Sequence, residues 1–228
     1  MIIVNDDEHS LQIKFTDHTE EMITSQNSPY TVISEGEIPN IWSNIGKWAK
    51  QLTQKHQDEI GVPVITKGGD DKPPFMPLLE KTAKALVAGK GALSLTWQKG
   101  KPEYQIILKQ GEKVLFEQLV KNRAIQLPEL EFMPGEYQLL LSDGEQRQVT
   151  SFFTVVEKLP AYPLELTDES LASLSKPARL TVQALWLANQ EEGKWLFEAY
   201  QQVAEVSKDN HFAQVLQKAL GNGIILKP

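Results

Sequence analysis

The chain has 228 residues, and its 30 Asp and Glu residues against 23 Lys and Arg residues give a net charge of −7. Phosphate groups are neutralised by clustered cations, so an acidic chain without a basic block is expected to bind neither nucleic acid nor an anionic membrane. The sequence contains no cysteine, which excludes disulfide bonds, thiolate metal sites and a cysteine nucleophile.

The first ten residues, MIIVNDDEHS, have neither the basic region nor the apolar core of a signal peptide. No stretch approaches the roughly 20 apolar residues of a membrane-spanning helix. We therefore expect a cytoplasmic protein. The alternative is a periplasmic or envelope protein of bacteria whose chain has been trimmed to its soluble part.

Residues 1–35 are rich in short apolar runs. In SLQIKF, the apolar residues Leu11, Ile13 and Phe15 alternate with polar ones, which is the pattern of a half-buried strand. The runs IIV, EEMITS and YTVIS predict further strands, with turns at Asp17-His18 and Asn27-Ser28-Pro29. This arrangement of strand, polar turn and strand resembles the β-repeat of FecR-like regulatory domains of bacterial envelopes.

An amphipathic helix is predicted to begin after Pro39-Asn40 and to end near Gly61, which completes a first module over residues 1–60. Its apolar face includes Trp42 and Trp48. Packing of both rings against the preceding strands is the simpler interpretation. The alternative is that Trp42 and Trp48 form a partner-binding surface with an aromatic anchor.

Residues 61–90 are predicted to be a linker and a short helix. Glycine and proline are concentrated in residues 61–77, and Leu78–Val87 (LLEKTAKALV) has a helical pattern. The Gly68-Gly69-Asp70-Asp71 stretch lacks the spacing of a phosphate-binding loop and the further oxygen ligands of a calcium loop, so we interpret it as a solvated turn.

Six short strands are predicted over residues 91–158. Apolar and polar residues alternate in LSLTW, YQIIL and YQLLLSD, and Gly, Pro, Asn or Asp residues separate the strands at intervals of about ten residues. Gln110-Gly111-Glu112 and Asp143-Gly144 predict hairpin turns. Short strands at this spacing indicate an antiparallel sandwich or barrel.

The segment FMPGEY, which ends at Tyr137, places a Pro-Gly turn just before a tyrosine that opens a strand. It resembles the tyrosine corner of Greek-key sandwiches. Together with Trp97 and Tyr104, it makes residues 91–157 similar to a fibronectin type III or related immunoglobulin-like domain. The resemblance implies a spacer or recognition module whose Trp97, Tyr104 and Tyr137 are core residues. The first strand of the sandwich comes either from VPVIT or from the end of the Leu78 segment.

Residues 164–222 are predicted to form a helical module that packs on the sandwich. Asp168 is expected to cap a helical turn, Pro177 to open a helix, and Asp209 or Asn210 to cap the last helix, which ends at Gly221. The run ALWLANQEEGKWLFEAYQ resembles a tetratricopeptide-type helical hairpin. No second copy follows at a fixed period, so we expect one helical appendage and no solenoid.

The four histidines, His9, His18, His56 and His211, have no metal-binding spacing with one another, and nucleophile-elbow and dinucleotide-loop motifs are missing. The carboxylate pairs Glu20-Glu21, Asp70-Asp71 and Glu191-Glu192 are adjacent in sequence, so their side chains diverge and are expected to be solvated. The sequence therefore predicts no catalytic residue, no metal site and no cofactor.

The sequence as a whole predicts an α+β, multi-module protein around a central antiparallel immunoglobulin-like or fibronectin III-like sandwich. We expect a non-catalytic bacterial protein that acts through protein–protein interaction as a scaffold, adaptor or regulatory module. A carbohydrate-binding or cell-wall-binding module is the first alternative, and a hydrolase without a recognised motif is the second.

Overall fold

The structure is a computed structural model, and it describes residues 11–14, 20–23, 41–59, 71–80, 84–208 and 210–224. The chain forms two compact units, Met1–Ile41 and Trp42–Pro228. The division predicted at residues 60, 90 and 158 stays a prediction.

The first unit contains an antiparallel pair of strands, β1 (Leu11–Lys14) and β2 (Glu20–Ile23), with Leu11 opposite Ile23. The pair confirms the strands predicted from SLQIKF and EEMITS. The predicted strands IIV and YTVIS and the turn at Asp17-His18 lie outside the described residues, so the resemblance to FecR-like repeats stays a prediction.

Helix α1 (Ile41–Glu59) begins directly after Pro39-Asn40, as predicted. Ile41, Ile45 and Trp48 are buried, and they recur at intervals of four and three residues. This spacing places them on one side of a helix, so the burial pattern follows from the period of the apolar residues.

The prediction of a short helix over Leu78–Val87 is wrong at the C-terminal end of this segment. A single 3-10 turn, η3 (Pro77–Leu79), is followed by strand β3 (Ala85–Val87). β3 runs parallel to the last strand of the sandwich, where Leu86 lies opposite Val155. Ala, Leu, Glu and Lys are good helix formers, but intrinsic propensity amounts to less than about 1 kcal/mol per residue, and pairing with a sheet edge overrides it. The end of the Leu78 segment therefore supplies the first strand, while VPVIT lies outside the described residues.

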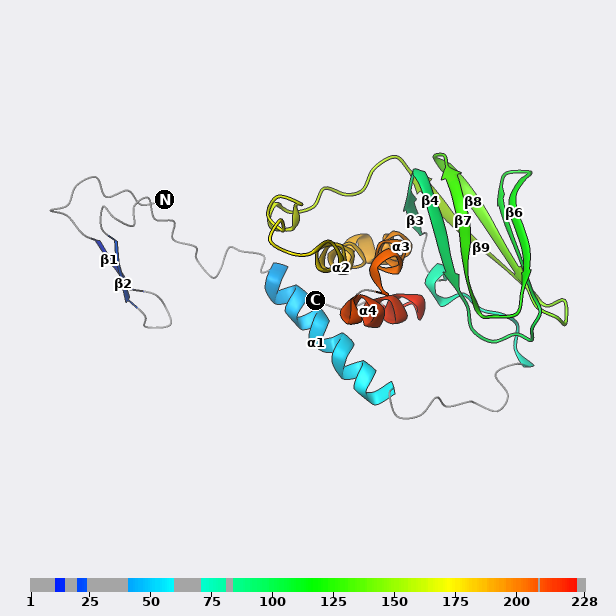
Figure 1. Cartoon of the computed structure of the whole chain (residues 1–228), viewed down its shortest axis with the longest axis horizontal. Coiled ribbons are helices and arrows are strands. Elements are labelled where there is room, and N and C mark those ends of the chain that lie inside the picture. The colour runs from blue at the N-terminus through cyan, green and yellow to red at the C-terminus, as the bar shows by residue number, and fades with distance from the viewer. Residues whose placement is uncertain are drawn as a thin grey trace. The chain divides into compact units, whose positions relative to one another are not determined.

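Seven strands form the sandwich in the part of the second unit that the structure describes (Figure 1). Five of them form one sheet in the order β3-β9-β8-β5-β6, and β4 and β7 form the other. All pairs are antiparallel except β3 with β9. The remaining strands are β4 (Gly89–Thr96), β5 (Tyr104–Gln110), β6 (Lys113–Val120), β7 (Ala124–Phe132), β8 (Gly135–Ser142) and β9 (Gln148–Val156).

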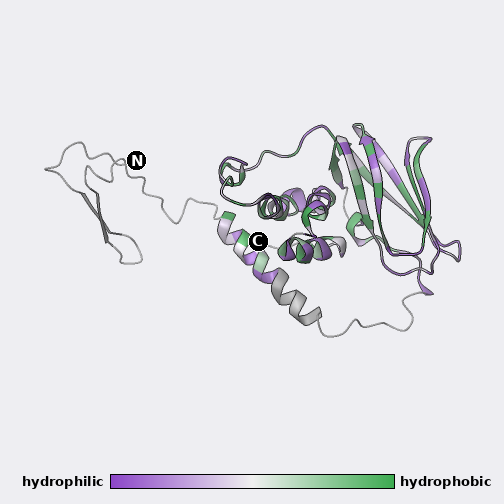
Figure 2. Cartoon of the chain, in the orientation of Figure 1, coloured by the Kyte–Doolittle hydropathy of each residue, from purple (hydrophilic) through white to green (hydrophobic). Residues whose placement is uncertain are grey.

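Alternate residues of β5, β8 and β9 and of the second half of β4 are buried between the two sheets, and Figure 2 shows the corresponding alternation of hydropathy along the strands. Trp97 and Tyr104 pack edge to face with ring centroids 5.3 Å apart. Tyr137 stacks on Phe153 at 5.3 Å. All four rings are buried, so the prediction that Trp97, Tyr104 and Tyr137 belong to the core is confirmed.

The tyrosine corner is present at Tyr137. Its hydroxyl donates to the Met133 carbonyl at 3.0 Å and accepts the Met133 N–H at 2.9 Å. A second tyrosine is tied down similarly, because the Tyr104 hydroxyl donates to the Gly100 carbonyl at 2.9 Å and accepts from Arg123 Nε at 2.9 Å. These bonds satisfy buried phenolic hydroxyls and fix the loops before β5 and β8.

The β8–β9 hairpin predicted from Asp143-Gly144 is present, and Asp143 organises it through its side chain. The Asp143 carboxylate is fully buried and accepts the backbone N–H groups of Lys101, Glu145 and Arg147 at 3.0–3.1 Å. The Arg147 guanidinium adds an ion pair at 2.6 Å. Burial by itself raises the pKa of Asp143, but these donors outweigh it and lower the pKa to about 2.

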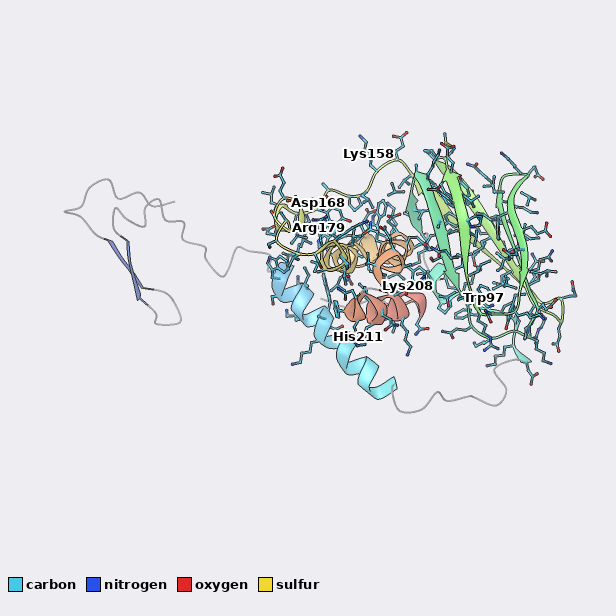
Figure 3. All side chains as sticks on the ribbon, viewed as in Figure 1. Trp97, Lys158, Asp168, Arg179, Lys208 and His211 are labelled. Carbon is cyan, nitrogen blue, oxygen red and sulfur yellow. The ribbon has the colours of Figure 1, made fainter. Side chains whose placement is uncertain are left out.

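The described C-terminal residues form three α-helices, with Pro177 in the first turn of α2, Asn210 capping α4 and Gly221 ending α4, as predicted. Asp168 does not cap a helical turn. Thr167 Oγ1 accepts the Ser170 N–H instead, and Asp168 pairs with Arg179 at 3.2 Å (Figure 3). The elements are η4 (Leu164–Leu166), α2 (Lys176–Leu187), η5 (Gln190–Gly193), α3 (Leu196–Val206) and α4 (His211–Gly221).

Helix α3 packs against β3 and β4, which are the edge strand of the larger sheet and a strand of the smaller one (Figure 1). Phe197 is fully buried, and its ring centroid lies 5.0 Å from that of Phe153 in the sandwich. The Ala85 N–H donates to the Lys194 carbonyl at 2.9 Å. The helices and the sandwich therefore share one core. The resemblance to a tetratricopeptide hairpin stays a prediction.

Candidate functional site

The face of the five-stranded sheet that points away from β4 and β7 carries apolar side chains in contact with solvent. Leu119 on β6 is 63% exposed and Phe152 on β9 is 53% exposed. Ile107 and Leu140, on the strands between them, are half-buried. We call these four residues the outer stripe.

The strand register makes the outer stripe continuous. Ile107 on β5 lies directly opposite Leu140 on β8. Leu119 lies opposite Gln105, and Phe152 lies opposite Gln138, so each is a diagonal neighbour of the central pair. Diagonal neighbours on one face of a sheet have Cα atoms about 7–8 Å apart, within reach of large side chains. The outer stripe therefore crosses four strands without a gap.

Polar side chains surround the outer stripe. Gln105, Lys109 and Gln138 occupy neighbouring outward positions on β5 and β8. Gln105 Nε2 donates to Glu117 Oε1 at 2.6 Å, and both groups are exposed. An apolar centre with a polar border is the composition of a recognition surface, whereas a surface that only meets water carries scattered single apolar residues.

Strand β6 forms an open edge beside the outer stripe. Among the described residues it pairs only with β5. An extra residue, Leu115, bulges out of this pair, so that Val114 lies opposite Lys109 and joins the outward face. Val114 is 48% exposed. β7, which pairs only with β4 among the described strands, contains Pro128, and proline blocks further pairing because it has no N–H to donate.

The two tryptophans of α1 have different surroundings. Trp42 is 46% exposed, whereas Trp48 is 4% exposed. Trp42 is therefore open to a partner, and Trp48 has the burial of a core residue. Their predicted role as a joint partner-binding surface stays a prediction.

A cavity of 420 Å³ lies where β3 and β4 meet α3. Glu198 on its wall accepts the Val87 N–H at 3.0 Å and a Gln202 amide N–H at 3.1 Å. Burial raises the pKa of Glu198, and these two donors reduce the effect. Gln201 exchanges two hydrogen bonds with the backbone of Ser94, at 2.8 and 3.1 Å. These polar groups attach the helix to the strands.

A smaller cavity of 170 Å³ is lined by Glu80 and Lys84 among others. The Lys84 ammonium donates to the Gly193 carbonyl at 3.1 Å, and burial lowers the pKa of Lys84 to about 8. Lys84 thus links the start of β3 to η5, and its hydrogen bond to Gly193 is part of the packing between the strand and the helices. Sequence reasoning missed it because Lys84 lies in a segment predicted to be helical.

The described residues contain no group of three or more His, Asp or Glu side chains placed to hold a metal ion. His211 is exposed at the start of α4. Glu191 is exposed, as predicted, and it also accepts from Trp195 Nε1 at 2.8 Å and from Lys194 at 2.6 Å. These two donors, of which Lys194 has the larger effect, hold the pKa of Glu191 below its ordinary range.

Comparisons with known proteins found partial matches among solved structures. No family model and no curated protein matches the chain. Sidekick-1 immunoglobulin domains 1-5 match with a TM-score of 0.27 at 16% identity, covering 38% of this chain and 20% of that one. Fibronectin(III)-like modules of Clostridium thermocellum CbhA match with a TM-score of 0.25 at 15% identity, covering 35% of this chain and 93% of that one.

The matched stretch spans only a fifth of the Sidekick-1 chain. The class of the sandwich is carried by the strand order and by the tyrosine corner at Tyr137. On these grounds residues 85–156 form an immunoglobulin-like, fibronectin III-like sandwich within an α+β chain. No described helix is long and apolar enough to cross a lipid bilayer.

Proposed function

We propose that this protein is a non-catalytic protein-interaction module that binds its partner through the outer stripe. The observation that carries the proposal is the continuity of Leu119, Ile107, Leu140 and Phe152 across four strands, with both ends exposed. Sandwich folds of this class serve many functions, so the fold by itself does not specify a partner, and the outer stripe is the feature that favours one.

The chemistry of the outer stripe favours a protein partner. Aliphatic side chains bind by excluding water from a complementary apolar surface, and the single aromatic ring at Phe152 adds a large contact area. The glutamines and Lys109 beside the stripe can form the polar rim of such an interface. Trp42, the exposed aromatic residue of α1, is a second candidate contact in the role of scaffold, adaptor or regulatory module.

A carbohydrate platform would require neighbouring exposed aromatic rings. Among the described side chains, the exposed aromatic residues are Trp42 on α1 and Phe152 on β9. Phe152 is flanked by Leu140 and Gln138 on its own sheet. This composition supports a protein partner over a glycan.

The proposal is tested by site-specific cross-linking. A photoreactive phenylalanine analogue is placed at position 152 in the chain as its own cells express it, and the control analogue replaces Glu129, which is exposed on β7. We expect position 152, and not position 129, to capture a protein. That protein is then purified and titrated against the wild type and the Phe152→Ala variant, with an expected loss of affinity of about tenfold or more.

Two results would contradict the proposal. One is capture that is equally efficient from positions 152 and 129, or absent from every position of the outer stripe. The other is a purified partner whose affinity is unchanged by both Phe152→Ala and Leu119→Ala. Either result places the interaction surface elsewhere on the molecule.

A further inference from the structure

The exposed edge of β6 has a sequence that complements itself. We infer that one partner of this protein is a second copy of the same chain, with the two β6 strands paired antiparallel about a two-fold axis at Leu119. The inference rests on the proposed function, because it assigns an occupant to one end of the outer stripe.

The edge is suited to strand pairing along part of its length. β6 has no proline, and the regular portion after the bulge at Leu115 runs from Phe116 to Val120. Its unpaired N–H and C=O groups are available to another strand. Among the described strands nothing covers this edge.

The alternation of the strand limits the possible registers. Glu117 and Leu119 lie opposite Ile107 and Gln105 and point outward, whereas Gln118 lies opposite buried Ile106 and points inward. Residues directly opposite one another in an antiparallel pair lie on the same face of the sheet. A symmetric pair of β6 strands is therefore centred on a residue. The interior residues of the regular portion, which leave a paired residue on each side of the axis, are Glu117, Gln118 and Leu119.

Charge decides among these three registers. Centring on Glu117 places two carboxylates against each other, which is unfavourable. Centring on Gln118 places Glu117 opposite an apolar residue, Leu119. Centring on Leu119 places Leu119 against its own copy and Glu117 against Lys121, the first residue after β6, twice by symmetry. Only the last register gives an apolar contact and two opposite-charge pairs.

The present partners of the two charged residues do not oppose this arrangement. Lys121 Nζ lies 3.7 Å from Glu103, with both side chains more than half exposed. The bond from Gln105 to Glu117 lies on the outward face and is also exposed. Exposed pairs of this kind contribute little, so they can be exchanged for contacts across the two-fold axis.

Dimerisation in this register also extends the outer stripe. Leu119 is the end of the stripe on β6, so the stripes of the two copies meet at the axis and form one apolar track across both sheets. The interface is small for a permanent dimer, and we therefore expect a concentration-dependent equilibrium between monomer and dimer.

Because the sequence contains no cysteine, a single introduced cysteine reports the register without background. The Leu119→Cys variant is expected to form a disulfide-linked dimer under mild oxidation, since directly opposite residues have Cβ atoms about 4.5–5.5 Å apart. The matched control is Val114→Cys on the same strand and face. In the proposed register the two copies of residue 114 are about ten residues apart along the strands, roughly 33 Å, so that variant stays monomeric.

A charge exchange provides the second test, with sedimentation velocity as the readout. Glu117→Lys is expected to raise the dissociation constant of the dimer about fivefold or more, because it places a second ammonium group against Lys121 of the other copy. Adding Lys121→Glu to the same chain restores the opposite charges and should restore the wild-type constant. Thermal melting of each variant by circular dichroism verifies that these exposed substitutions leave the fold intact.

The inference is overturned if Leu119→Cys and Val114→Cys cross-link equally, or if neither does. It is also overturned if the wild type sediments as a monomer at about 1 mM or if the double charge exchange fails to restore association. If one of these outcomes is found but position 152 still captures a different protein, the proposed function stands without self-association. If Leu119→Cys forms the linked dimer but position 152 captures no other protein, self-association is the function of this face.

Discussion

Strands β3 and β6 are the two edges of the same sheet, and they differ in what lies beside them. β3 is covered by α3, which supplies a buried phenylalanine and a side-chain acceptor, Glu198, for the Val87 N–H of the strand. Among the described residues β6 has no neighbour beyond β5, and its exposed residues include Leu119 and Val114. An exposed sheet edge attracts other strands, so proteins cover it or use it. In the part of the chain that the structure describes, the β3 edge is therefore covered by a helix of the same chain, and the β6 edge is open.

The comparison predicts that substitutions at the covered edge unfold the protein, whereas those on the open face only change association. Phe197→Ala should lower the free energy of unfolding by about 3–5 kcal/mol, since the ring is fully buried against Phe153. Its control is Phe152→Ala, the neighbour of Phe153 on the outward side of β9, with an expected loss below about 1 kcal/mol. Urea denaturation followed by tryptophan fluorescence measures both, and similar losses for the two variants would show that the face of β9 packed against α3 is no more important for stability than its outward face.

The β8–β9 turn lies on neither edge strand. It shows how much the buried hydrogen bonds and ion pair of Asp143 contribute to the free energy of unfolding where no described helix covers them. Asp143→Asn leaves Arg147 and the backbone donors around it poorly matched, so we expect a loss of about 2–4 kcal/mol at pH 7. The exposed neighbour Glu145, which also contacts Arg147, provides the control as Glu145→Gln, with a much smaller expected loss.

This turn also predicts a pH dependence. The pKa of Asp143 is lowered from 3.8 to about 2 on folding, so the folded state binds this proton more weakly than the unfolded state. The stability from the ionised carboxylate is complete above about pH 4 and is lost as the pH falls through 2. Urea midpoints measured between pH 7 and pH 2 should therefore converge for wild type and Asp143→Asn. A constant difference across that range would contradict the assignment.

The polar attachment of α3 is expected to contribute less than its apolar core. Gln201→Ala removes two hydrogen bonds to the Ser94 backbone and should cost about 1–3 kcal/mol. Hydrogen exchange at the Ser94 amide should become faster in the variant, which localises the effect to β4. Gln214→Ala on the exposed side of α4 is the matched control, and an equal loss there would mean that the Gln201 bonds have no special role.

The smallest expected effect concerns Glu198. Burial raises its pKa in the folded state, so the folded protein is favoured while Glu198 is protonated and loses stability as the pH rises through the folded pKa. Glu198→Gln keeps an acceptor for the Val87 N–H but carries no charge. We expect the variant to gain stability relative to wild type between pH 4 and pH 8, by less than about 1 kcal/mol. Thermal melts at the two pH values measure this gain, and a relative loss at pH 8 would show that the negative charge is favourable at the start of α3.

Local patterns were sufficient to predict much of the sandwich. Alternation predicted the strands around Leu95, Ile106 and Leu139, and the FMPGEY segment predicted the bond between Tyr137 and Met133. The start of α2 at Pro177 and the cap of α4 at Asn210 were predictable for the same reason, because helix starts depend on residues within a few positions of one another.

Contacts between distant segments were not predictable in this way. Ala85–Val87 ends a segment with a helical pattern, and it forms a strand because β9 offers an unpaired edge about 70 residues later. Asp168 is a residue type that often caps helices, but Thr167 caps this turn, and Asp168 forms an ion pair with Arg179.

The sequence by itself determined the strands β4 to β9, their turns and the tyrosine corner, since each depends on alternation or turn chemistry within about ten residues. Only the tertiary structure decided which strand became the first edge, which edge α3 covers and which apolar residues meet on the outer face. The outer stripe exists because four strands pair in a particular register, and a shift of one residue would turn Leu119 or Phe152 to the opposite side of the sheet. Register is a relation between distant segments, and therefore a candidate site built from it becomes visible only when the chain is folded.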